Sequence, residues 1–142
     1  METEYATPYV EYKEHNEQVV EELEKNLDLL KDKRWRMSHL YWINNKSGQK
    51  VPFKMNRAQA HFANNFLLIK SPYFRHLILK SRQLGFTTFF DIYILDEILF
   101  NPNKEALIIA HKLKDATEIF DRKIDFVVKN IPEEVKEISF KL

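Results

Sequence analysis

The stretch LILKSRQLGFTTFFDI, residues 77 to 92, decides which fold this chain is predicted to have. An apolar segment of strand length leads through Gly85 into two threonines and a second apolar segment. This layout is typical of a phosphate-binding loop, in which backbone N–H groups at a helix N-terminus surround phosphate oxygens. The lysine expected directly after the glycine is missing, and Phe86 takes its position. An ordinary connection between a strand and a helix is therefore the alternative.

The composition limits the kind of protein that this chain can be. Its 142 residues suit about one domain, and 44% hydrophobic residues allow a sizeable core. Lys+Arg 22 against Asp+Glu 21 leaves a net charge of +1, so the overall charge indicates neither a nucleic acid nor a membrane as partner. There is no cysteine, and the 5 histidines show no metal-binding spacing.

Two segments, the N-terminal sequence and the most apolar run, favour an intracellular, soluble domain with no membrane partner. The N-terminal sequence METEYATPYVEYKEHNE is acidic and has no apolar segment of the kind found in signal peptides. The most apolar run, residues 89–100, is too short to cross a bilayer and contains acidic residues.

The remaining chain is predicted as helices and strands placed around the opening stretch. Helices are expected at 9–34, 55–69, 88–100 and 112–131, strands at 76–80 and 105–111, and a hairpin at 39–54 that turns at Gly48. From residue 77 onward, strand, helix, strand and helix alternate, which predicts right-handed crossovers and a parallel sheet. The predicted fold class is therefore α/β, with the helix and hairpin preceding the sheet.

The loop itself carries groups that suit a nucleoside triphosphate with Mg²⁺. Aligned with G-x-x-x-x-G-K-[ST], residues 80–87 match the pattern at Gly85 and Thr87. Glycine permits a close backbone approach to phosphate, and a threonine hydroxyl can ligate Mg²⁺. Lys80 at the start of the loop and Arg82 within it offer positive charge in place of the missing lysine.

ILKSRQLGFTT resembles the phosphate-binding loop of the large subunit of tailed-bacteriophage terminases, the motors that package DNA. Many members of that family carry an S-R-Q-x-G-[FKW]-[ST]-T loop, and in some the lysine is shifted to the loop's beginning, as Lys80 is here. YWINNKSGQKVPFKMNRAQ is similar to the family's lead into its adenine-contacting glutamine. Residues 99–132 are similar to its second strand and following helix, so the resemblance covers roughly residues 35 to 132.

The resemblance implies roles for individual residues. Gln59 would contact adenine, and Lys80 would replace the usual loop lysine. Arg82 would be the catalytic group that senses or stabilises the γ-phosphate, and Thr87 would bind Mg²⁺. The implied nucleotide-binding set is Gln59, Lys80, Ser81, Arg82, Gln83, Leu84, Gly85, Phe86, Thr87 and Thr88. Thr88 can instead cap the helix or share the metal role, and Phe86 is expected to pack rather than to stack on a base.

Asp96 and Glu97 look like the acidic pair that ends a metal-binding strand in such ATPases, but their position argues against that role. They follow the loop by about ten residues on one helix, which at about 1.5 Å per residue places them far from its N-terminus. We expect them to be structural or surface groups. In the family, the metal-binding and catalytic carboxylates come later in the sequence. This chain is therefore expected to bind ATP weakly and to hydrolyse it negligibly.

The resemblance predicts an N-terminal helical segment at 1–34 and, at 35–142, the N-terminal portion of a P-loop ATPase domain with a parallel sheet and flanking helices. In the intact protein, ATP hydrolysis would drive DNA translocation in the cytoplasm of a bacterial host. Double-stranded DNA, a portal and a small terminase subunit are the implied partners, and an oligomeric ring is compatible with that role. Two alternatives stay open: another P-loop ATPase, such as a helicase-like motor, and a non-catalytic βαβ module that binds protein or DNA.

Overall fold

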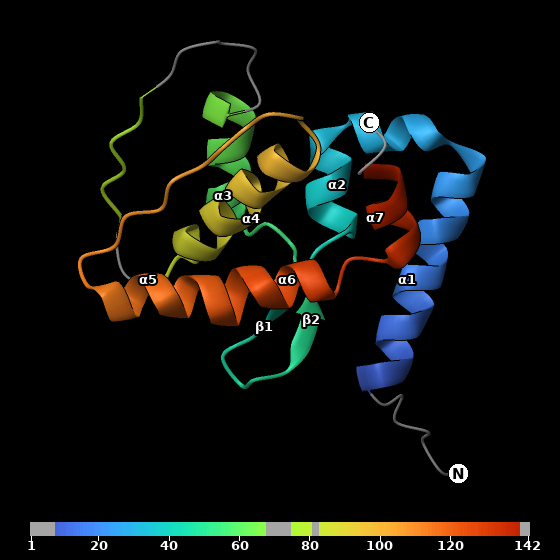
Figure 1. The fold of residues 1–142 in the computed structure, drawn as a ribbon, viewed down its shortest axis with the longest axis horizontal. Helices are drawn as coiled ribbons and strands as arrows, with labels where there is room; N and C mark the ends of the chain where they lie inside the picture. Colours follow the sequence, from blue (N-terminus) through green and yellow to red (C-terminus); the bar gives the residue numbers. More distant parts are fainter. Residues whose placement is uncertain (1–7, 68–74, 81–82, 140–142) are drawn as a thin grey trace.

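The computed structural model describes residues 8–67, 75–80 and 83–139, which form helices and one small hairpin that projects at the lower edge of the view (Figure 1). In chain order the elements are α1 (Pro8–Lys25), η1 (Leu27–Lys31), α2 (Lys33–His39), β1 (Trp42–Asn44), β2 (Lys50–Pro52), α3 (Arg57–Phe62), η2 (Ala63–Leu67), α4 (Phe86–Leu99), α5 (Leu113–Ile119), η3 (Phe120–Ile124), α6 (Asp125–Lys129) and α7 (Glu133–Ser139). Here η1 is a 3₁₀ helix, and η2 and η3 are π-helical turns.

The predicted hairpin is confirmed. Strands β1 and β2 pair antiparallel, with Ile43 opposite Val51. The Asn45 side chain accepts hydrogen bonds from the backbone N–H groups of Ser47 and Gln49, which closes the turn. Gly48 adopts a φ of +76°, the left-handed conformation that glycine enters without a steric penalty.

The predicted parallel sheet is wrong. Within the described residues the one sheet is the β1–β2 pair, and the segments expected as strands at 76–80 and 105–111 are extended but unpaired. Leu77 and Leu79 are 101% and 100% exposed, and Leu107 and Ile109 are 80% and 84% exposed. A strand is stabilised by a neighbour that pairs its backbone and covers its side chains, and neither segment has one here. The described part of the chain is mostly helical, so the α/β, P-loop NTPase-like assignment does not describe it.

The long N-terminal helix predicted for 9–34 divides into α1, η1 and α2. Two polar residues cause the breaks, because each side chain satisfies the backbone N–H two residues later. Asn26 accepts from Asp28 N–H, and Asp32 accepts from Arg34 N–H. Both side chains thereby begin a new helical segment, as N-cap residues do.

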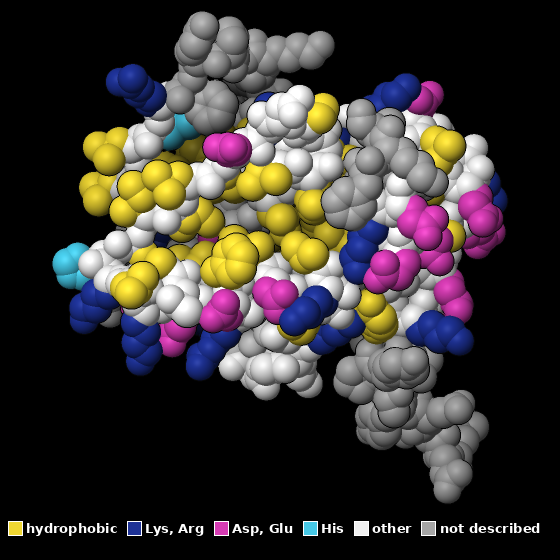
Figure 2. All heavy atoms as spheres, in the orientation of Figure 1, with side chains coloured by type: hydrophobic (Ala, Val, Ile, Leu, Met, Phe, Trp, Pro, Cys, Tyr) yellow, Lys and Arg dark blue, Asp and Glu magenta, His cyan; other side chains and the backbone are white. Residues whose placement is uncertain are grey.

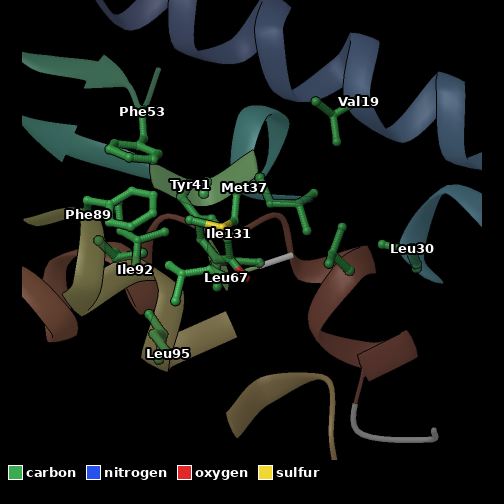
Figure 3. Close-up of a cluster of buried hydrophobic side chains, with 14 of the residues drawn as sticks. Val19, Leu30, Met37, Tyr41, Phe53, Leu67, Phe89, Ile92, Leu95 and Ile131 are labelled. Carbon is green, nitrogen blue, oxygen red and sulfur yellow. The ribbon is translucent and has the colours of Figure 1, made fainter. Parts of the chain in front are cut away.

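The helix predicted for 112–131 runs as α5, η3 and α6, and it ends before Pro132 as expected. The helix predicted for 88–100 is α4, which is apolar nearly all round. It buries Phe89, Ile92 and Leu95 in the core of the molecule, together with side chains from α1, α2 and α6 (Figure 3). Tight packing around α4 fixes the position of its N-terminus, where the predicted phosphate loop ends.

A buried ion pair joins α4 to α2. The Asp96 carboxylate, which is fully buried, accepts hydrogen bonds from Arg36 Nε at 2.8 Å and Arg36 Nη2 at 2.6 Å. Tyr41 donates its hydroxyl hydrogen to Asp96 Oδ1 at 2.6 Å. Glu97 is half-buried and pairs with Lys33 and Lys104. The two carboxylates therefore have structural roles, as the sequence predicted. No helix in the described part of the chain combines the length and apolarity that a membrane crossing requires.

Candidate functional site

The predicted loop ends at Gly85, the N-cap residue of α4. Its φ of +67° and ψ of +14° lie in the left-handed region. A Cβ atom at this position would lie 2.8 Å from Nε2 of Gln59, so a larger residue would meet a side chain as well as backbone strain. Glycine is therefore needed here for two separate reasons.

Two amide side chains at the start of α3 bind the carbonyl oxygens at the end of the loop. Gln59 donates from Nε2 to the carbonyl oxygens of Leu84 at 3.2 Å and Gly85 at 2.9 Å. Asn56 donates from Nδ2 to the same Leu84 oxygen at 3.0 Å. These residues also cap α3: Gln59 Oε1 accepts from Asn56 N–H, and Asn56 Oδ1 accepts from Gln59 N–H. The capping box thus fixes both amides in the orientation that binds the loop.

The N–H groups of the first turn of α4 make no hydrogen bond to these two amides. Among the described residues, the N–H groups of Phe86, Thr87 and Thr88 have no hydrogen-bond acceptor, and no side chain caps the helix. The first intrahelical bond at this end runs from Phe89 N–H to the Gly85 carbonyl. Unsatisfied N–H groups and the helix dipole together give this end a partial positive charge. The carbonyl oxygens of Leu84 and Gly85 are therefore hydrogen-bonded, whereas the first-turn N–H groups have no acceptor within the described residues.

The threonines after Gly85 have different surroundings. Thr87 is exposed and follows Phe86 directly. Thr88 is half-buried and lines a small cavity beneath α4 together with Asp91 and Lys123. The Asp91 carboxylate lies 3.5 Å from Lys123 Nζ, and burial raises the pKa of that carboxyl. Thr87 is consequently the threonine whose hydroxyl is accessible at the helix N-terminus.

Positive charge reaches the loop from the β1–β2 turn. Lys46 donates from Nζ to Oε1 of Gln83 at 3.0 Å, and both side chains are exposed. Gln83 has a φ of +67°, which is uncommon for a residue other than glycine. Within the described residues Lys46 has no acidic partner, so its charge is not neutralised at the loop.

The other residues of the predicted set divide into three groups. Phe86 is 7% exposed and packs its ring against Phe62 and Phe89, so it is a core residue as expected. Lys80 is exposed, and Leu84 is half-buried. Ser81 and Arg82 lie outside the described residues, so the structure gives no position for the predicted γ-phosphate contact.

The structure places Gln59 against the loop, where its side chain binds loop carbonyl oxygens and is not open to an adenine ring. Gln59 is 3% exposed, and its amide already makes three hydrogen bonds, two of them to the loop. Two features of this site were not predicted from the sequence. The capping box of Asn56 and Gln59 could have been read from the pattern Asn-x-x-Gln, but the bond from Asn56 to Leu84 spans 28 residues and depends on the tertiary fold. The bond from Lys46 spans 37 residues and has no sequence signal.

In the described part of the chain, no group of three or more His, Cys, Asp or Glu residues is placed to hold a metal ion. Comparison with known proteins found no match to a family model, a curated protein or a solved structure.

Proposed function

We propose that residues 80–88 bind the phosphates of a nucleoside triphosphate, and that the chain is the ATP-binding part of a DNA-packaging motor of the terminase large-subunit type. One observation carries the proposal of phosphate binding. Within the described residues the first-turn N–H groups of α4 lack acceptors, while the carbonyls of Leu84 and Gly85 accept hydrogen bonds from the Asn56 and Gln59 amides. An anion is the ligand that such a pre-organised end of a 14-residue helix would stabilise.

Different groups around the N-terminus of α4 would contact the phosphates and the Mg²⁺ ion. The N–H groups of residues 86–88 would donate to the phosphate oxygens. Thr87 would offer its exposed hydroxyl to Mg²⁺, and the metal would neutralise part of the phosphate charge. Lys80, Arg82 and Lys46 would supply cations from the loop and from the hairpin. Gln59 supports the loop in this proposal, because contact with adenine would require it to give up a hydrogen bond that it now makes.

The type of motor is proposed from the resemblance of the loop and its flanks to the terminase sequences, and hydrolysis belongs to the intact protein. Orienting the attacking water requires a properly placed base or carboxylate. Asp96 is committed to Arg36, and Glu97 is committed to Lys33 and Lys104. We therefore expect binding without turnover from these 142 residues. Steady-state ATP hydrolysis that disappears in Lys80→Ala would overturn this part of the proposal.

Calorimetric titration of the full chain tests phosphate binding directly. MgATP and inorganic tripolyphosphate should both bind weakly, whereas adenosine should not bind, because the recognised groups are phosphates. Thr87→Val should remove the dependence of ATP binding on Mg²⁺. If neither heat nor a thermal shift appears with MgATP or tripolyphosphate at millimolar concentration, the loop does not bind nucleotide phosphates.

The lysine that contacts the loop provides a matched pair of variants. Lys46→Gln should weaken tripolyphosphate binding by roughly fivefold, the effect of losing one exposed charge contact of about 1 kcal/mol. Lys54→Gln is the control, because Lys54 is an exposed lysine just after the same hairpin and makes no hydrogen bond or ion pair with the described residues of the loop. Equal affinities for the two variants would show that Lys46 takes no part in binding.

A further inference from the structure

Residues 105–110 form an extended segment whose backbone is unpaired. None of its N–H or carbonyl groups makes a backbone hydrogen bond to another described residue. From residue 107 onward its side chains alternate: Leu107 and Ile109 are 80% and 84% exposed, whereas Ile108 and Ala110 are half-buried; Ala106, before them, is exposed. This is the pattern of a strand with one covered face and one open face, and it leaves the strand with unsatisfied edges.

An apolar groove lies beside this segment. Figure 2 shows apolar side chains gathered between α4 and the α5–η3 helix, on the face that the segment borders. The groove is lined by Ile94, Leu95, Ile98, Ala106, Ile108, Ala116, Ile119, Phe120 and Ile124, together with two polar residues, Thr117 and Asp121. Phe120 is 62% exposed and Ile98 is 39% exposed. Together with Ala106 and Ile108 they give the groove an apolar surface of a kind that usually marks an interface, whereas Leu107 and Ile109 alternate with Ile108 and lie on the other side of the segment.

We propose that residues 105–110 pair antiparallel with the same residues of a second copy of this chain. The unpaired backbone requires a strand as occupant, because a strand alone supplies donors and acceptors at matching intervals. The segment is also complementary to itself. With Ile108 on the twofold axis, Leu107 lies opposite the partner's Ile109, and the two outward residues pair on one face.

The flanking charges agree with this register. Glu105 would lie opposite the partner's His111, which is a favourable pairing for a histidine that carries a proton. Lys104 would lie opposite the partner's Lys112, but Lys104 already forms an ion pair with Glu97 within its own chain. The contact between Lys104 and the partner's Lys112 is a like-charge pair that opposes association, and the Lys104–Glu97 ion pair offsets part of it. The antiparallel register centred on Ile108 therefore pairs the apolar residues and is compatible with the charged residues that flank them.

The expected dimer is weak. Stable interfaces bury about 1,200–2,000 Å² in total, and a ladder of six residues alone buries less than that. Coverage of Phe120 and Ile98 in the groove must add to it, and we expect dissociation in the micromolar range or above. The association must therefore be measured over a wide range of protein concentration.

Analytical ultracentrifugation of the full chain tests the proposal. The average mass should rise with concentration from 17.1 kDa toward twice that value. Leu107→Lys with Ile109→Lys should weaken association at least tenfold without unfolding the monomer, because both side chains are already exposed. Gln18→Lys with Leu27→Lys adds the same charge at exposed positions away from the segment and should leave association unchanged. A monomer at all concentrations, or equal loss in both variants, overturns the proposal.

Amide hydrogen exchange separates strand pairing from non-specific apolar contact. In an antiparallel pair, alternate N–H groups point toward the partner strand. Every second amide among residues 105–110 should therefore become protected as the dimer forms. Association with no change in these amides would show that copies meet through the groove alone and would overturn the pairing. None of these outcomes depends on whether the loop binds nucleotide.

Discussion

Replacing Asp96 by asparagine should destabilise the chain by about 3–5 kcal/mol, the range measured when one partner of a buried ion pair is removed. The substitution preserves shape but leaves the Arg36 guanidinium, which is 5% exposed, without a negative charge. It also weakens the bonds from Arg36 Nε, Arg36 Nη2 and the Tyr41 hydroxyl. Because small domains are stable by about 5–15 kcal/mol, this loss is a large part of the whole.

Urea denaturation followed by tryptophan fluorescence measures the effect. With a slope of about 2 kcal/mol per molar urea, a loss of about 4 kcal/mol lowers the midpoint by about 2 M. Glu97→Gln is the neighbouring control, and it should cost about 1 kcal/mol or less because Glu97 is partly solvated. Arg36→Met with Asp96→Leu should recover part of the loss, because it removes both charges but leaves the buried Tyr41 hydroxyl and the Leu30 carbonyl without their partners. A loss below about 1 kcal/mol in Asp96→Asn, or no recovery in the double variant, would refute the assignment of this pair as a buried charge that needs its partner.

Three further predictions concern the loop, its glycine and the hairpin. Gly85→Ala should lower the free energy of unfolding more than Gly48→Ala. Both variants replace a positive-φ glycine, which costs about 1–2 kcal/mol, but only at Gly85 does a side-chain atom, Gln59 Nε2, lie 2.8 Å from the new Cβ. Equal losses in thermal melts would contradict the close contact. Asn56→Ala should cost about 1–2 kcal/mol because a helix cap is lost, and it should also weaken tripolyphosphate binding. Unchanged affinity in a folded variant would show that the Asn56 side chain does not support phosphate binding by the loop. Burial lowers the pKa of Lys50 to about 8 although its ammonium lies over the Tyr12 ring. Because the unfolded chain binds this proton more tightly, the free energy of unfolding should rise between about pH 8 and pH 10.5, and Lys50→Met should remove that part of the rise in urea midpoints.

Local signals in the sequence predicted the elements that local interactions hold together. The hairpin follows from Gly48 and its flanking apolar residues, and α4 and the α5–α6 helix follow from apolar content and stop signals. The divisions at Asn26 and Asp32 could also have been read, since both are strong N-cap residues.

The parallel sheet could not be predicted reliably, because a strand depends on a partner that its own sequence does not reveal. Residues 105–111 have the apolar, β-branched composition of a buried strand, and their alternation is visible in the structure. What is missing is a paired neighbour. The same limit applies to the site: Gly85 was found from the spacing of the loop and Gln59 only from the family resemblance, whereas Lys46 reaches the loop through the tertiary fold.

The phenylalanine at the lysine position now has a physical explanation. Phe86 begins α4 with its ring buried against Phe62 and Phe89, so the first helical residue anchors the helix to the core. A lysine there would have to leave that cluster, at the cost of the apolar area that Phe86 buries. Positive charge for a phosphate must then come from outside the helix. Lys46 at the hairpin turn is in contact with the loop, and Lys80 precedes it in the sequence. Phenylalanine in place of lysine therefore removes a positive charge from the loop and adds a buried ring that holds the start of α4 in the core. It is compatible with an anion at the backbone N–H groups of α4, because those groups do not depend on the side chain of residue 86.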